Sequence, residues 1–319
     1  MAHQDVISAP RGDGPGMPDP IERRRGRRRR NRREYGVFAL LILPNIAMVL
    51  TFEYWPVLYN AYLSMTRWNM ISGSPVWVGL KNYINLFTSS QFHQVLLNTL
   101  VFGGFVVIGS VLIGLALAVL INQKLHLRGI VRTAAFAPYV ISGAAVATLW
   151  LFIFDPNYGL SRVVFSWFGA SSPHWTTDSA WAMPALIIAY LWKGTGFVAI
   201  VYLAGLQGLP EEYDEAARID GAGRWTIFRR ITLPLLSPVT FFVMVITMIG
   251  TFQAYDLIAV MTNGGPGIAT TTLSWFVYER AFKASDAGGG AAAAVVLFFI
   301  LLALTALQNA YSQRKVHYQ

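Results

Sequence analysis

A single lysine inside a long apolar stretch is the side chain best placed to bind a charged or polar ligand in this chain of 319 residues. Lys193 stands between Trp192 and a Gly-Thr-Gly run that contains Thr195, and such a run can bend a helix and turn backbone dipoles toward a cavity. Charge in apolar surroundings is costly, so this ammonium is a functional candidate for contact with a phosphate or a sugar hydroxyl. The alternatives are an internal ion pair with Asp256 and a lysine that extends along the helix bundle.

A second candidate group lies in another apolar stretch. Gln253, Tyr255 and Asp256 offer an amide, a phenol and a carboxylate, which suit a ligand rich in hydroxyl groups, and the tyrosine also offers a face for stacking against a sugar. The alternative is that these polar groups hold neighbouring helices together. Both groups depend on the elements that carry them.

Composition places those elements in a membrane. Hydrophobic residues make up 55% of the chain and charged residues 13%, and the mean hydropathy of +0.46 is too high for a soluble domain of this length. Crossing a hydrocarbon core of about 30 Å takes roughly 20 apolar residues in a helix, and open strands cannot pair their backbone there. Six windows meet or approach that length, at residues 35–52, 95–121, 130–154, 181–205, 238–261 and 290–311. We therefore expect an all-α membrane protein with six transmembrane helices over residues 35–311.

The distribution of Lys and Arg predicts the orientation of these helices. Residues 1–35 carry ten, the 122–133 loop three, the 208–235 loop four and the carboxyl end two, against five on the opposite side of the membrane. Positive charge is enriched in cytoplasmic loops, so both termini are expected in the cytoplasm, which an even number of helices also requires.

Residues 1–34 form an arginine-rich arm, and residues 312–319 a short tail. The run of arginines at 23–33 could bind nucleic acid, but its place directly before the first apolar window favours a role in topology and attraction of anionic lipid. We therefore expect no bound nucleic acid. The glycines and prolines before this run predict a disordered cytoplasmic arm. The chain has no cysteine and its five histidines are scattered, so we expect no metal site and no catalytic group.

A polar insert at residues 208–235 separates two apolar windows. Glu211, Glu212 and Asp214 favour a helix start, since carboxylates near a helix N-terminus are stabilising, and Asp214 is spaced to pair with Arg218. Gly221 should end that helix before a second short one begins. The insert is thus predicted to be a helix-turn-helix unit, with a plain solvated loop or a helix resting on lipid headgroups as alternatives.

The insert also carries a motif. Its residues follow the pattern E-A-A-x3-G-x9-I-x-L-P, which resembles the coupling-loop signature of inner-membrane permease subunits of ABC importers. The matching positions, with the aspartate of the turn, are Glu215, Ala216, Ala217, Asp220, Gly221, Ile231, Leu233 and Pro234. The resemblance implies that these residues couple the membrane helices to an ATPase.

Other segments resemble the carbohydrate type of these permeases. They are residues 79–87 (GLKNYINLF), 98–99, 128–138, 252–266 and 270–273, and the likeness extends over residues 35–311. The stretch at residues 191–193 and the end at residues 315–318 are most similar to the smaller permease of glycerol-phosphate and glycerophosphodiester importers.

The resemblance implies a multi-pass subunit of a bacterial inner membrane transporter, working by alternating access. Its partners would be a second homologous permease subunit, two ATPase subunits that bind ATP and Mg²⁺, an extracytoplasmic substrate-binding protein and membrane lipids. The chain has no G-x-x-x-x-G-K-[ST] motif for a phosphate loop, so we expect a permease that is not itself an enzyme. The expected solute is a carbohydrate or a glycerol phosphate; a neutral di- or oligosaccharide, or an ion-coupled secondary transporter, are the alternatives.

Overall fold

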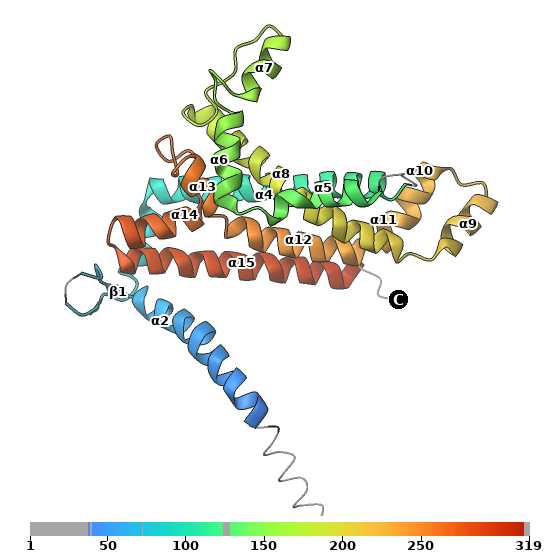
Figure 1. Ribbon diagram of the computed structural model, residues 1–319. Helices are drawn as coiled ribbons and strands as arrows, with labels where there is room; N and C mark the ends of the chain where they lie inside the picture. The colour runs from blue at the N-terminus through green and yellow to red at the C-terminus, as the bar shows by residue number, and fades with distance from the viewer. Residues whose placement is uncertain (1–37, 39, 72, 124–127, 316–319) are drawn as a thin grey trace, which may run out of the picture. The chain divides into compact units, whose positions relative to one another are not determined.

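The computed structural model describes residues 38, 40–71, 73–123 and 128–315 (Figure 1). The arginine-rich arm at residues 1–34 and the last part of the tail, residues 316–319, lie outside the described residues. The chain divides into two compact units, Met1–Tyr59 and Asn60–Gln319.

A long helical stretch, Leu40–Leu63, crosses the boundary between the two units. It contains a π-helical turn at Leu50–Tyr54 and ends in α2 (Trp55–Leu63), and most of its large apolar side chains are exposed. The first predicted window ended at residue 52, whereas the helix continues to Leu63. The extension is rich in tyrosine and tryptophan, which are typical of the membrane–water interface.

The second unit begins with a short antiparallel pair, β1 (Thr66–Arg67) and β2 (Val76–Trp77), in which Thr66 lies opposite Trp77. Next come α3 (Lys81–Thr88) and two long apolar helices, α4 (Ser90–Ile121) and α8 (Ser179–Gln207). α4 packs most extensively against α8, and small residues permit the approach. A Cβ added at Gly114 would stand 2.4 Å from a Val198 methyl group.

The window at residues 130–154 is not one straight helix. It divides into α5 (Arg128–Val140) and α6 (Gly143–Ile153), whose axes differ by 101°. Pro138 near the end of α5 removes a backbone donor, and Ser142 caps α6 by accepting a hydrogen bond from the Ala145 backbone at 3.4 Å. α7 (Leu160–Trp167) follows in the loop that leads to α8.

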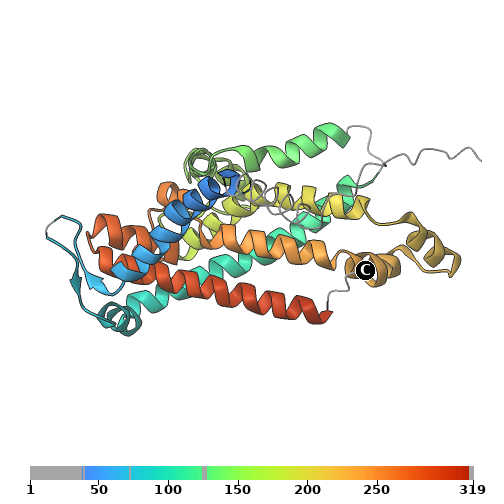
Figure 2. The same ribbon diagram turned by 90° about the horizontal axis from the view of Figure 1, so that it is seen from below.

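The polar insert and the next window also consist of several pieces. After α9 (Glu211–Ile219) come α10 (Arg224–Ile227), a π-helical turn (Phe228–Thr232), α11 (Leu233–Leu235) and α12 (Ser237–Phe252), with a 63° bend before α12. The window at 238–261 breaks at residues 253–255, and α13 (Asp256–Met261) resumes beyond the break. The chain ends with α14 (Leu273–Tyr278), a π-helical turn (Glu279–Lys283) and α15 (Ala287–Lys315). α15 lies beside α12 (Figures 1 and 2).

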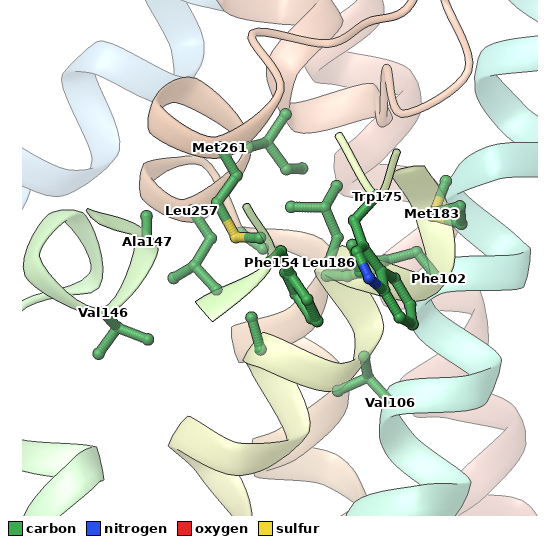
Figure 3. Close-up of a cluster of buried hydrophobic side chains, with 14 of the residues drawn as sticks. Phe102, Val106, Val146, Ala147, Phe154, Trp175, Met183, Leu186, Leu257 and Met261 are labelled. Atoms are coloured by element: carbon green, nitrogen blue, oxygen red, sulfur yellow. The ribbon is translucent and has the colours of Figure 1, made fainter. Parts of the chain in front are cut away.

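Four helices in the described part of the chain are long and apolar enough to cross a membrane, and the number rises to six if each bent pair forms one span. The all-α membrane fold is therefore confirmed. The main buried cluster lies where α4, α6, α8 and α13 meet, and Figure 3 shows Phe102, Leu186 and Leu257 converging there. Trp175 stacks on Phe154 in the same cluster with 4.6 Å between ring centroids.

The backbones of α5 and α8 come close at Gly196, which gives the first prediction. A Cβ added there would stand 1.8 Å from the carbonyl oxygen of Ala135, a backbone atom that cannot move aside. Gly196→Ala should lower stability by about 1–3 kcal/mol through overpacking. Thermal unfolding of the purified protein would measure the loss.

Gly194→Ala is the matched control on the same helix, because no atom lies within 4 Å of the added methyl group. It should leave stability unchanged or raise it by up to about 1 kcal/mol, since alanine is the better helix former. Equal melting temperatures for the two variants would contradict the observed packing.

Candidate functional site

Lys193 belongs to α8, and its side chain reaches the carboxyl end of α5, where the chain breaks before α6. Its Nζ donates a hydrogen bond of 3.4 Å to the Tyr139 carbonyl and stands 5.4 Å from the centre of the Tyr139 ring. The last carbonyls of a helix lack partners and carry negative partial charge, so an ammonium is stabilising there. The Tyr139 ring is itself held by stacking on Phe197 at 4.7 Å.

Asp256 is the first residue of α13, and its side chain lies on the other side of the same break, against the beginning of α6. A Cβ added at Gly143, the first residue of α6, would stand 1.4 Å from Asp256 Oδ2, so the carboxylate packs directly on the glycine backbone. Its Oδ1 accepts a hydrogen bond of 3.0 Å from the Leu257 backbone at the beginning of α13. Negative charge is favourable at a helix N-terminus, and this carboxylate accepts a hydrogen bond at that of α13 and lies against that of α6.

The carbonyl groups freed at the end of α12 also find partners. The hydroxyl of Tyr190 on α8 donates a hydrogen bond of 2.8 Å to the Gly250 carbonyl, one turn before the break. The backbone amides of Gln253 and Ala254 bond back to Ile249 and Thr251. Side chains of α8 and α13 thus form hydrogen bonds with backbone groups at the two breaks.

The alternative in which Lys193 pairs with Asp256 is not observed, because the described residues show no ion pair between these two side chains. Lys193 bonds instead to the end of α5, and Asp256 to the beginning of α13. The Gly-Thr-Gly run after Lys193 does not interrupt α8, and Gly196 within it allows close packing against α5.

The other predicted residues of the solute pathway occupy different surroundings. Trp192 is partly exposed with its ring edge-on to Trp150 at 5.9 Å, and Thr195 is buried. Gln253 is exposed at the end of α12. Tyr255 packs into an aromatic group, with one face of its ring stacked on Trp275 and Tyr278 meeting it edge-on.

The first helix of the polar insert ends in a hydrogen-bonded cap. α9 ends at Ile219, and Gly221 adopts the left-handed conformation with φ +79°. The Gly221 amide bonds to the Arg218 carbonyl at 3.0 Å and the Ala222 amide to the Ala217 carbonyl at 2.9 Å, the pattern of a Schellman cap. The predicted pair Asp214–Arg218 is present at 3.8 Å, on the surface.

One face of the insert is anchored and the other is exposed. Ala217 and Ile227 are buried, whereas the motif residues Glu215, Ala216, Asp220 and Gly221 are exposed. Ile231 and Leu233 are half-buried in the turns that lead to α12, and Pro234 is exposed beside them. Ile219 is 87% exposed and Trp225 70% exposed, which is unusual for large apolar side chains in a polar segment.

Comparison with known proteins identifies the family. Residues 110–317 match the family described as the binding-protein-dependent transport system inner membrane component. The sn-glycerol-3-phosphate transport system permease protein UgpA of Yersinia pestis is 34% identical over 281 residues, covering 88% of this chain and 95% of the relative. The chain belongs to this family of transport permeases.

Other relatives of the permease carry different descriptions. A probable ABC transporter permease protein of Pyrococcus horikoshii is 36% identical over 76% of this chain and 84% of its own length. The trehalose/maltose transport system permease protein MalF of Thermococcus litoralis is 34% identical over 77% and 83%. The described fold resembles a solved chain of a bacterial ABC transporter for import of the acidic polysaccharide alginate, with a TM-score of 0.77, 27% identity, and coverage of 90% of this chain and 98% of that one. The same transporter is also solved in complex with a periplasmic protein that holds an alginate pentasaccharide.

Several residues that shape the permease site escaped sequence analysis. Tyr139 and Gly143 flank the α5–α6 break, and Tyr190 closes the α12 break. Pro138 inside an apolar window was the available signal for the first break. The exposed pair Ile219 and Trp225 stood out only once their burial was known.

The position of Lys193 leads to a prediction about its role. Lys193→Met should lower the stability of the purified permease by about 1 kcal/mol, because the end of α5 loses a favourable charge. Lys193→Arg, which keeps the charge and its donors, should lose less. Thermal unfolding would measure the stability, and uptake by the reconstituted transporter would give the half-saturating solute concentration.

We expect that concentration to stay unchanged in Lys193→Met. An unchanged melting temperature with a raised half-saturating concentration would show instead that the ammonium contacts the solute.

Proposed function

We propose that this permease is one subunit of an ATP-driven importer and that the insert at residues 208–235 is its joint with an ATPase. The observation that carries the proposal is a rigid helix end that holds Ile219 and Trp225 exposed on a segment rich in charge. A large apolar side chain on such a segment suits the core of a protein interface, where aromatic and aliphatic anchors dominate binding energy.

Both ends of the insert pack against the membrane helices. Leu209 packs in the cluster of α8 side chains, and Leu236, between α11 and α12, is fully buried in the same cluster. Ile227 is the buried residue of the second short helix. A displacement of the insert would pull on α8 and α12 through these packed ends, and a rigid-body movement of the attached helices is one way to transmit a nucleotide-driven change.

The partners follow from family membership. A second permease subunit would complete the path, two ATPase subunits would bind ATP and Mg²⁺, and an extracytoplasmic binding protein would deliver the solute. The solved alginate transporter with its periplasmic protein supports this arrangement. The charge distribution supports a cytoplasmic position for the insert, where an ATPase could reach it.

The solute is a hydroxyl-rich compound of the carbohydrate or glycerol-phosphate class. Relatives named for sn-glycerol-3-phosphate and for trehalose and maltose support this class, and both are matched over most of the chain. Exposed Gln253 and Asp256 and partly exposed Trp192 supply hydrogen bonds and an aromatic edge at the breaks. The ammonium of Lys193 is already bonded to Tyr139, and this observation favours the neutral di- or oligosaccharide as the second candidate.

Substitution of Gly221 tests the joint. Gly221→Val places a β-branched residue at φ +79°, which costs about 1–3 kcal/mol locally and disrupts the turn after α9. No other atom lies within 4 Å of the added Cβ, so assembly of the membrane helices should be preserved. We expect loss of solute-stimulated ATPase activity in the reconstituted transporter, with normal recovery of the assembled complex.

Gly223→Val is the matched control, because that glycine is also in open space but has φ −71°, which any residue adopts. It should retain stimulation. Full stimulation in Gly221→Val would refute the joint, and solute uptake in membranes that lack the ATPase would refute ATP-driven import in favour of ion coupling.

A ligand screen on the cognate binding protein tests the solute class. Glycerol 3-phosphate and glycerophosphodiesters would be titrated beside maltose and trehalose, with an amino acid as a negative control, by calorimetry. We expect binding only among the hydroxyl-rich compounds. Affinity confined to the neutral sugars would select the second candidate, and affinity only for the amino acid would exclude the proposed class.

A further inference from the structure

The short helix α3 is fixed to the rest of the second unit along one side. The Asn82 amide donates two hydrogen bonds of 2.8 Å, to the carbonyls of Ser64 and Thr66. The Tyr83 hydroxyl lies 2.7 Å from Ser64 Oγ, and Leu86 is buried among side chains of α4, α14 and α15. These contacts set the rotation of α3 about its own axis.

The same rotation leaves a second side of α3 apolar and exposed. Leu80, Ile84 and Phe87 are 61%, 60% and 50% exposed, and their spacing places them on one stripe of a helix. Successive residues turn by about 100°, so the polar residues Lys81 and Asn85 fall on a separate flank. The free surface of α3 is thus divided into an apolar strip and a polar strip.

α3 runs across the end of α4 rather than along it. Ser89, with φ −81° and ψ 123°, is the single residue between the two helices, and its extended backbone turns the chain. In Figures 1 and 2 this segment, drawn in teal, crosses the end of the long α4 that lies farthest from α9 and α10. Because α4 is a candidate span, a helix one residue from its end lies close to the boundary between hydrocarbon and water.

Aromatic residues occupy the same end of the unit. Trp77 in β2 is 60% exposed, and its ring lies 6.1 Å from that of Tyr62. Trp and Tyr are enriched at headgroup level, since one end of each side chain is apolar and the other forms hydrogen bonds. The chain segment just before α3 therefore carries side chains typical of a membrane interface.

We propose that α3 is an interfacial membrane helix, with Leu80, Ile84 and Phe87 seated at the acyl-chain boundary of the leaflet opposite the α9–α10 insert. Its polar flank, with Lys81, faces the lipid headgroups and water. The bilayer is the expected occupant because the strip adjoins a spanning helix and is bounded by a charged flank. The proposal adds a lipid contact that the proposed transport function does not require.

The absence of cysteine from the chain permits a direct test. Ile84→Cys would carry a nitroxide spin label in the whole transporter, with cysteine-free partner subunits, in vesicles of phosphatidylethanolamine and phosphatidylglycerol. Power saturation compares collisions with apolar oxygen and with a water-soluble nickel chelate. We expect the label at residue 84 to collide mainly with oxygen.

Asn85→Cys is the matched control, since it is the next residue, is also exposed, and lies on the polar flank. Its label should collide mainly with the nickel chelate. Equal access of the chelate to both positions would overturn the proposal. Immobilisation of the residue 84 label only on addition of the binding protein would overturn it in favour of a protein-docking surface.

Discussion

The structure depends on one constraint, which is that backbone groups within a membrane must be paired even where a helix stops. Two of the predicted membrane windows stop and resume, at residues 141–142 and 253–255. Lys193, Asp256 and Tyr190 satisfy the helix ends created there. The polar groups that stand out in an apolar sequence are therefore the groups that make a broken helix tolerable.

The same constraint separates the rigid parts of the permease from the parts where polar chemistry is possible. α4 and α8 are continuous and pack closely through small residues, so they form a frame for the other helices. The breaks leave Gln253 and Asp256 exposed beside that frame. The insert with its capped helix end connects the end of α8 to the beginning of α12.

The class of fold could be predicted from the sequence, because long apolar windows are a strong signal. In the insert, the acidic residues and Gly221 correctly indicated where α9 begins and ends. The breaks in the helices could not be predicted. An apolar run looks the same whether it is straight or bent, and only Pro138 marked the first break, while the second had no proline. The partners of Lys193 and Asp256 could not be foreseen either, since they are backbone groups that become available only when a helix ends. The roles of the motif residues in coupling remain predictions from the resemblance.

The contact between Asp256 and Gly143 has a mechanical consequence. α6 and α13 pack against each other and begin at the same carboxylate, so they share one pivot. A helix of the length of α6 is about 16 Å long. A rotation of α6 about its contact with Asp256 would therefore move its far end, which leads into the loop before α7, much more than its beginning.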